Sequence, residues 1–169
     1  MAGERQRQEV AALYVSSREG VVRYLIASGL DPDKAEEATQ EAFLRLYSAW
    51  RDGQRIEQPK AWVYRVARNI AINVAKRGVE QSVFSESAAA TFASPQSSAE
   101  EALIERELAE SFREAMGRLS ERQRECLELR AQGLRFAEIA DVLGIQISTA
   151  GEYVRRGIEE LKKWSRSKN

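Results

Sequence analysis

The sequence predicts an all-α protein made of two small helical domains joined by a flexible linker. Apolar residues recur every three to four positions along most of the 169 residues, and no stretch alternates convincingly between apolar and polar residues, so helices are expected and strands are not. This periodicity disappears over residues 79–100, a segment rich in serine and alanine that is typical of a linker. We therefore expect an N-terminal domain at 1–78 and a C-terminal domain at 101–169.

Three helices are expected in the N-terminal domain. The first covers residues 10–29, and the second has Asp31 as its N-cap and Pro32 at its first helical position. The third opens at Pro59 in the same way. Their buried faces are predicted to consist of Ala35, Ala38, Ala42, Phe43 and Leu46 on the second helix and Val63, Val66, Ala67, Ile70 and Val74 on the third.

The C-terminal domain shows the pattern of a helix-turn-helix. A helix from about Glu101 to Arg118 is followed by one that opens with a Ser120/Gln123 capping box and stops at Gly133. A short apolar helix, a turn at Gly144 and a final helix with basic residues then follow. The residues predicted to face the core here are Phe136, Ile139, Ala140, Leu143, Ala150, Val154, Ile158 and Leu161. The alternative is an ordinary helical hairpin, which would bury the same residues.

The composition argues against an enzyme. The chain has one cysteine and no histidine, which excludes an internal disulfide and removes the commonest general base and metal ligand. No phosphate-binding loop or nucleophile and base pair is visible, so no catalytic residue, metal or cofactor is expected. Cys126 occupies an apolar position and is expected in the core. The N-terminus has no signal-like apolar segment, which predicts a cytoplasmic protein without membrane insertion.

The third predicted helix carries a second stripe that a core does not require. Its members are Trp62, Arg65, Asn69, Asn73 and Lys76. Residues 51–77 contain seven basic and two acidic side chains, although the chain as a whole has no net charge. Aromatic rings among arginines and asparagines suit single-stranded nucleic acid, because rings stack on bases while cations follow the backbone. The structural alternative is a solvated helix whose Trp62 and Tyr64 fill gaps in the core.

The final helix is expected to meet double-stranded DNA. Thr149 near its start can contact a phosphate or a base edge, and Arg155 and Arg156 supply charge. Gly151 and Glu152 weaken this interpretation, because glycine offers no side chain and glutamate repels phosphate unless it accepts from a cytosine amino group.

Three segments of the sequence are "KAEEATQEAFLRLY", "PKAWVYRVARNIAINVAKR" and "LSERQRECLELRAQGLRFAEIADVLGIQISTAGEYVRRGIEELKK". In this order and spacing, they resemble the extracytoplasmic-function (ECF) sigma factors of the sigma-70 superfamily. The resemblance implies a subunit that directs bacterial RNA polymerase to specific promoters. Residues 1–78 would be sigma domain 2, which binds the polymerase clamp helices and melts the minus-ten element. Residues 101–169 would be sigma domain 4, which binds the minus-thirty-five element and the polymerase flap.

Carried over by position, the resemblance assigns three sets of contacts. The minus-ten set is Arg51, Arg55, Trp62, Arg65, Arg68, Asn69, Asn73, Lys76 and Arg77. The minus-thirty-five set is Ser148, Thr149, Tyr153, Arg155 and Arg156. The polymerase-binding set is Glu37, Gln40, Glu41 and Arg45. Core RNA polymerase and promoter DNA are the implied partners, and the resemblance allows an anti-sigma factor as a further one.

Four positions depart from the family's usual pattern. Lys34 and Asn73 stand where acidic residues are common, and Gly151 and Tyr153 stand where basic residues are frequent. The sequence therefore leaves the promoter undefined. It also leaves open a stand-alone helix-turn-helix regulator, which "LSERQRECLELRAQGL" resembles as well, and a helical adaptor such as an anti-sigma partner.

Overall fold

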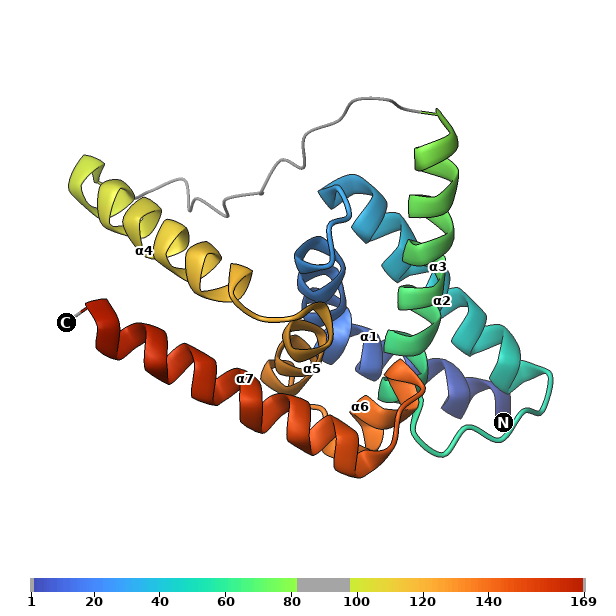
Figure 1. Cartoon of the computed structure of the whole chain (residues 1–169). Helices are drawn as coiled ribbons and strands as arrows, with labels where there is room; N and C mark the ends of the chain where they lie inside the picture. Colours follow the sequence, from blue (N-terminus) through green and yellow to red (C-terminus); the bar gives the residue numbers. More distant parts are fainter. Residues whose placement is uncertain (1, 82–97, 169) are drawn as a thin grey trace.

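The computed structural model describes residues 2–81 and 98–168, which form seven helices and contain no strand (Figure 1). The helices are α1 (Ala2–Ala27), α2 (Pro32–Arg51), α3 (Pro59–Gln81), α4 (Ala99–Gly117), α5 (Glu121–Ala131), α6 (Phe136–Leu143) and α7 (Ile147–Lys168). The prediction of an all-α fold is confirmed. Helix α1 begins well before residue 10, where the sequence pattern placed its start.

Helices α1, α2 and α3 pack into a first lobe. Asp31 caps α2 by accepting from the Asp33 amide at 3.1 Å, and Pro32 is its first residue, as predicted. All five residues predicted for the inner face of α2 are buried. On α3, Val63 and Ala67 are fully buried, whereas Val66, Ile70 and Val74 are only partly covered.

Helices α4 to α7 form a second lobe, in which α6 and α7 are the helix-turn-helix. Ser120 and Gln123 make the predicted reciprocal capping box of α5. Gly144 ends α6 with a left-handed φ of 66°, which only glycine adopts without strain. Cys126 lies in the core as expected.

Two predicted core positions of the second lobe are wrong. Phe136, the first residue of α6, is 38% exposed. Ile158 is 40% exposed, and Leu161 is only partly buried. The residue that faces α5 is Gly157, where an added Cβ would lie 2.7 Å from Leu127 Cδ1. The apolar stripe of α7 therefore passes through a glycine, which hydrophobic periodicity does not register.

The two lobes pack directly against each other in the structure. Helix α3 contacts α6, and α1 contacts α5 (Figure 1). The buried side chains of both lobes form one continuous cluster. Residues 82–97 of the predicted linker lie outside the described residues, and α3 and α4 extend into its ends. The domain boundaries remain a prediction. None of the helices in the described ranges is long and apolar enough to cross a membrane.

Candidate nucleic-acid interface

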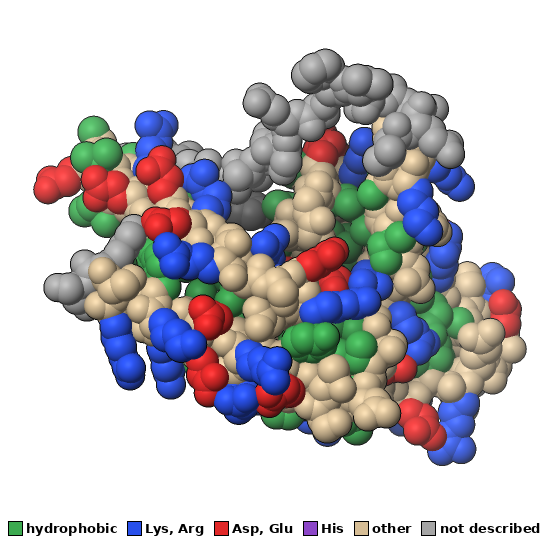
Figure 2. Space-filling view, viewed as in Figure 1, with side chains coloured by type: hydrophobic (Ala, Val, Ile, Leu, Met, Phe, Trp, Pro, Cys, Tyr) green, Lys and Arg blue, Asp and Glu red, His purple; other side chains and the backbone are tan. Residues whose placement is uncertain are grey.

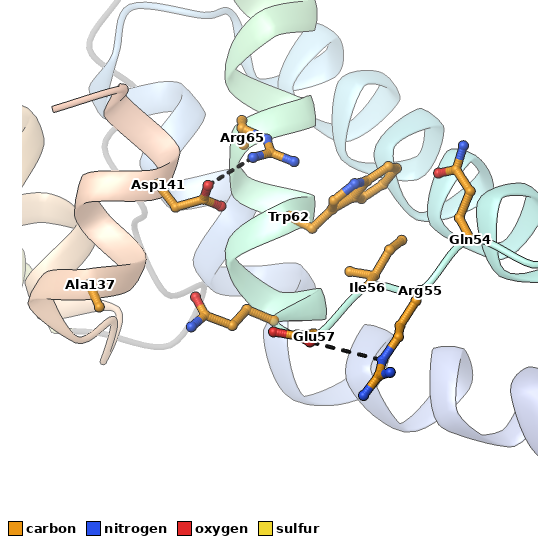
Figure 3. Close-up of a pocket in the computed structure, with 9 residues that line it drawn as sticks. Gln54, Arg55, Ile56, Glu57, Trp62, Arg65, Ala137 and Asp141 are labelled. Carbon is orange, nitrogen blue, oxygen red and sulfur yellow. Dashed lines mark hydrogen bonds and ion pairs between the residues drawn. The ribbon is translucent and has the colours of Figure 1, made fainter.

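A pocket of about 460 Å³ lies beside the N-terminal end of α3 and is open to solvent. The first lobe contributes most of its wall, and α6 contributes Ala137 and Asp141 (Figure 3). The lining residues from the first lobe are Gln54, Arg55, Ile56, Glu57, Gln58, Trp62 and Arg65. In Figure 3, the Trp62 ring extends from α3 toward Gln54, with Ile56 beside it. Three members of the predicted minus-ten set, Arg55, Trp62 and Arg65, therefore share one pocket.

The loop that forms this pocket is fixed at both ends by local sequence. Gly53 follows α2 with φ of 81°, and its amide donates to the Trp50 carbonyl at 3.0 Å. Pro59 then begins α3 with a backbone angle already suited to a helix. Figure 3 shows Ile56 of this short loop beside the Trp62 ring, whereas Arg55 pairs with Glu57 at 3.9 Å.

The two aromatic residues of α3 have different environments. Tyr64 is completely buried and meets Tyr24 edge-on, with ring centroids 5.7 Å apart. Burial raises the pKa of both phenols, so they remain neutral. The core interpretation is therefore correct for Tyr64. Trp62 is only partly buried and keeps a ring surface at the pocket.

Three cations of α3 are paired with the second lobe. Lys60 Nζ donates to the Gln132 carbonyl at 2.8 Å, and Arg65 pairs with Asp141 at 2.8 Å (Figure 3). Arg68 Nε lies 2.9 Å from Glu125, and these two side chains are 19% and 13% exposed. In this arrangement, groups of the second lobe occupy the donors that a nucleic-acid backbone would use.

The rest of the minus-ten set extends along α3 away from the pocket. Asn69, Asn73, Lys76 and Arg77 are exposed, and Arg51 at the end of α2 is exposed as well. Lys76 lies with Arg68 on a second groove of about 580 Å³ between the lobes. The structure thus divides this set between an open pocket, an exposed helix face and the contact between lobes.

The groove between the lobes contains an unusual carboxyl group. Burial raises the pKa of Glu128 to about 7; Arg124 opposes this shift, and the negative charge of Glu125 adds to it. Burial likewise raises the pKa of the Cys126 thiol to about 11, so the thiol stays protonated. The shift at Glu128 is not predictable from residue spacing, because it depends on which helices cover the carboxyl group. The burial of Cys126, in contrast, follows from its apolar position in the sequence.

The predicted duplex-binding residues lie on α7, along whose surface basic and acidic side chains are interleaved (Figure 2). Ser148, Arg155 and Arg156 are exposed, and Thr149 is half-buried. Tyr153 is half-buried too and packs against the core. Arg155 and Arg156 both donate to the carboxylate of Glu152.

The predicted polymerase-binding residues share the exposed face of α2. Glu37, Gln40, Glu41 and Arg45 are all exposed, and Arg45 pairs with Glu41 at 2.7 Å. Leu44 lies next to them and is 62% exposed. The sequence analysis did not include Leu44 in this surface. Its position outside the buried stripe of α2 indicates that it is exposed.

A second apolar surface, also missed, lies on α4. Its exposed members are Leu103, Ile104, Leu108 and Phe112. Helix α4 packs chiefly on α7 in the described part of the chain, and much of its apolar side stays uncovered. Exposed apolar patches of this kind are typical of surfaces that contact other proteins.

Comparison with known proteins identifies the family. Residues 13–79 match sigma-70 region 2, and residues 109–161 match sigma-70 region 4. Together these two matches cover more than half of the chain. The chain belongs to the ECF sigma factors of the sigma-70 family. The resemblance drawn from the sequence is confirmed, and this sigma factor serves promoter-specific transcription by RNA polymerase.

Individual relatives resemble the sigma factor over most of its length. The ECF RNA polymerase sigma factor SigK of Mycobacterium sp. (strain KMS) is 28% identical over 94% of this chain and 84% of its own. RNA polymerase sigma factor SigZ of Bacillus subtilis is 33% identical over 66% of this chain and 60% of its own. The solved sigma factor RpoE of Bartonella quintana, in complex with the anti-sigma factor NepR, has a TM-score of 0.66 at 25% identity; the match covers 92% of this chain and 95% of RpoE.

Proposed function

We propose that the first lobe binds the unpaired strand of the minus-ten element, using the Trp62 pocket and the exposed face of α3. In this proposal, α7, most of which lies inside the region 4 match, binds the minus-thirty-five element as duplex DNA. The observation that carries this proposal is the pocket itself, which joins one aromatic ring with Arg55 and Arg65 inside the region 2 match. Stacking of a base on a ring contributes about 1–3 kcal/mol, and cations at the rim attract the backbone. Asn69 and Asn73 continue this surface with uncharged donors and acceptors.

Strand separation needs core polymerase. Extruding a base from a duplex costs a few kcal/mol, which is about what one stacking ring returns. Stacking and pocket contacts in the first lobe therefore balance this cost without exceeding it. The sigma factor alone is expected to bind an opened strand but not to open it.

The contact between the lobes must open before the minus-ten strand binds. Asp141 forms part of the pocket wall and pairs with Arg65, so the second lobe occupies part of the proposed site. The two promoter elements also lie about one and a half helical turns apart, roughly 50 Å, whereas the lobes touch in the structure. Core polymerase would separate the lobes, and an anti-sigma partner, of the kind found with RpoE, would act by preventing their separation.

Polymerase contacts are assigned to two surfaces. The exposed face of α2, with Leu44 among Glu37, Gln40, Glu41 and Arg45, is the proposed contact for the clamp helices. The apolar side of α4 is the proposed contact for the flap, because four large apolar side chains of this helix are exposed to solvent.

Run-off transcription with purified core polymerase on a promoter library tests the strand-binding surface. Two variants, Trp62→Ala and the double variant Asn69→Ala with Asn73→Ala, avoid the residues paired between the lobes. Each is expected to reduce transcription at least tenfold while polymerase binding is retained. Arg23→Ala, an exposed arginine of α1 outside the surface, is the control.

Undiminished transcription by both variants would overturn the assignment. Binding of wild-type protein to promoter duplex, with and without core polymerase, separates the proposal from a stand-alone DNA-binding regulator. The proposal expects a shifted complex with polymerase only.

A further inference from the structure

The exposed stripe of α7 is centred on a carboxylate. At 100° per residue, Glu152 lies between Arg155 and Arg156 on the helix surface, and Ser148 lies one turn before it. The buried residues Ala150, Val154 and Gly157 occupy the opposite side. A helix that presents this stripe to a DNA groove therefore brings Glu152 to the middle of the contact.

Glu152 holds both neighbouring guanidinium groups. Arg155 donates to it through Nε at 2.9 Å and Nη2 at 2.7 Å, and Arg156 donates through Nε at 2.7 Å. Arg155 also pairs with Glu159 at 2.6 Å. Hydrogen bonds from Arg155, followed by those from Arg156, lower the pKa of Glu152 to about 2, so it is ionised and can only accept.

One acceptor position of this carboxylate remains available. A carboxylate offers about four lone-pair sites. Oε1 accepts from Arg155 Nη2 and Arg156 Nε, whereas Oε2 accepts from Arg155 Nε alone. Within the described ranges, Arg156 donates only through Nε, which leaves its two terminal nitrogens for DNA.

This network stabilises α7, but it also removes positive charge from the exposed face of the helix. Each single exposed ion pair on a helix changes a folding equilibrium by less than about fivefold. Against that small gain, Glu152 neutralises cations that would otherwise attract phosphates on a DNA-binding helix. A carboxylate at such a surface is favourable where it accepts from a cytosine amino group, and it is repelled by the acceptors that guanine and thymine present.

We propose that Glu152 is the specificity-determining residue of α7, which accepts a hydrogen bond from the amino group of one cytosine in the minus-thirty-five element through Oε2. This inference rests on the proposed function. Glu152 also positions Arg155 and Arg156, whose unused donors meet the adjacent phosphates or guanine edges. By neutralising charge, it weakens binding to other sequences and so increases the difference between cognate and random DNA.

A library selection with the full chain and core polymerase tests the proposal. Promoter duplexes randomised at the minus-thirty-five element are selected with wild-type protein, Glu152→Gln, Glu152→Ala and the control Glu160→Gln. The control removes the same charge from α7 at a residue that pairs with Lys163 instead of the two arginines. Binding to one random-sequence duplex is measured in parallel over a range of salt concentrations.

The proposal makes a base-specific prediction. Glu152→Gln should shift one position from cytosine to adenine, because an amide pairs with both N6 and N7 of adenine. Glu152→Ala should lose preference at that position, by about fivefold or more. Both variants should bind random duplex more tightly and with a steeper salt dependence than wild type, whereas Glu160→Gln should keep the wild-type preference.

Two outcomes contradict the proposal in distinguishable ways. If wild-type protein selects an element that both Glu152 variants select unchanged, the inference about Glu152 is overturned while the proposed function stands. If wild-type protein selects no upstream element at all, the duplex-reading role of α7 fails, and the inference fails with it.

Discussion

Trp62 and Tyr64 are only two residues apart, but they face different sides of α3. Two residues along a helix correspond to a rotation of about 200°, so a pocket-facing Trp62 places Tyr64 in the core. This geometry separates an aromatic residue that is available for stacking from one that serves packing. The structure shows that Tyr64 serves packing, whereas Trp62 packs partly against the core and also lines the pocket; its role in stacking stays a prediction.

Glu128 should make the stability of the protein depend on pH near neutrality. Its pKa is raised from 4.5 to about 7, so between these values the folded state holds a proton that the unfolded chain releases. The free energy of unfolding should therefore fall as pH rises through this window, by on the order of 1–2 kcal/mol. Urea unfolding at pH 5 and at pH 8 measures this decrease in the free energy of unfolding.

Two substitutions test whether Glu128 is responsible for this pH dependence of stability. Glu128→Gln should remove most of the decrease and stabilise the protein at pH 8, because the amide cannot ionise. Glu105→Gln, which replaces an exposed carboxyl on α4, should retain the wild-type decrease. An identical pH dependence in wild type and Glu128→Gln would show that another group is responsible.

At the scale of the helices and turns, glycines account for one correct and one wrong prediction from the sequence. Gly144 sits where the helix-turn-helix pattern requires a left-handed residue, and the structure confirms it. Gly157 occupies the buried side of α7, where its missing side chain allows close approach to Leu127. Periodicity counts apolar side chains, so it assigned that role to Ile158.

Alanine at two glycines of the helix-turn-helix should act in opposite directions. Gly144→Ala should destabilise the protein by about 1–2 kcal/mol, because φ of 66° is unfavourable for a residue with a Cβ. Gly151→Ala should stabilise it by up to about 1 kcal/mol, since this glycine lies inside α7 with open space around it. Thermal unfolding of the two variants compares them; equal effects would contradict the argument.

At the scale of the whole molecule, the contact between the lobes combines a continuous buried cluster with specific charge pairs. Arg68 and Glu125 are largely shielded from solvent, and Arg65 with Asp141 closes the edge of the pocket. Replacing both carboxylates with lysines places like charges opposite each other at short range. The lobes should then separate.

The double variant Glu125→Lys with Asp141→Lys should have a larger radius of gyration than wild type in small-angle X-ray scattering. Helical content by circular dichroism should be unchanged, because the helices of each lobe also pack on one another, α1 and α3 on α2 and α5 and α6 on α7. Glu19→Lys, on an exposed part of α1, is the control for charge alone. A wild-type radius in the double variant would mean that apolar packing holds the lobes together.

Local sequence determined the helices, their caps, the glycine turn and the family of this protein, because these features depend on residues that are close in the chain. Caps at Asp31 and Ser120 and the turn at Gly144 are examples. Only the tertiary structure decided which cations are already paired. Arg68 and Glu125 are separated by 57 residues, and no periodic pattern records which helix faces meet when two lobes pack together.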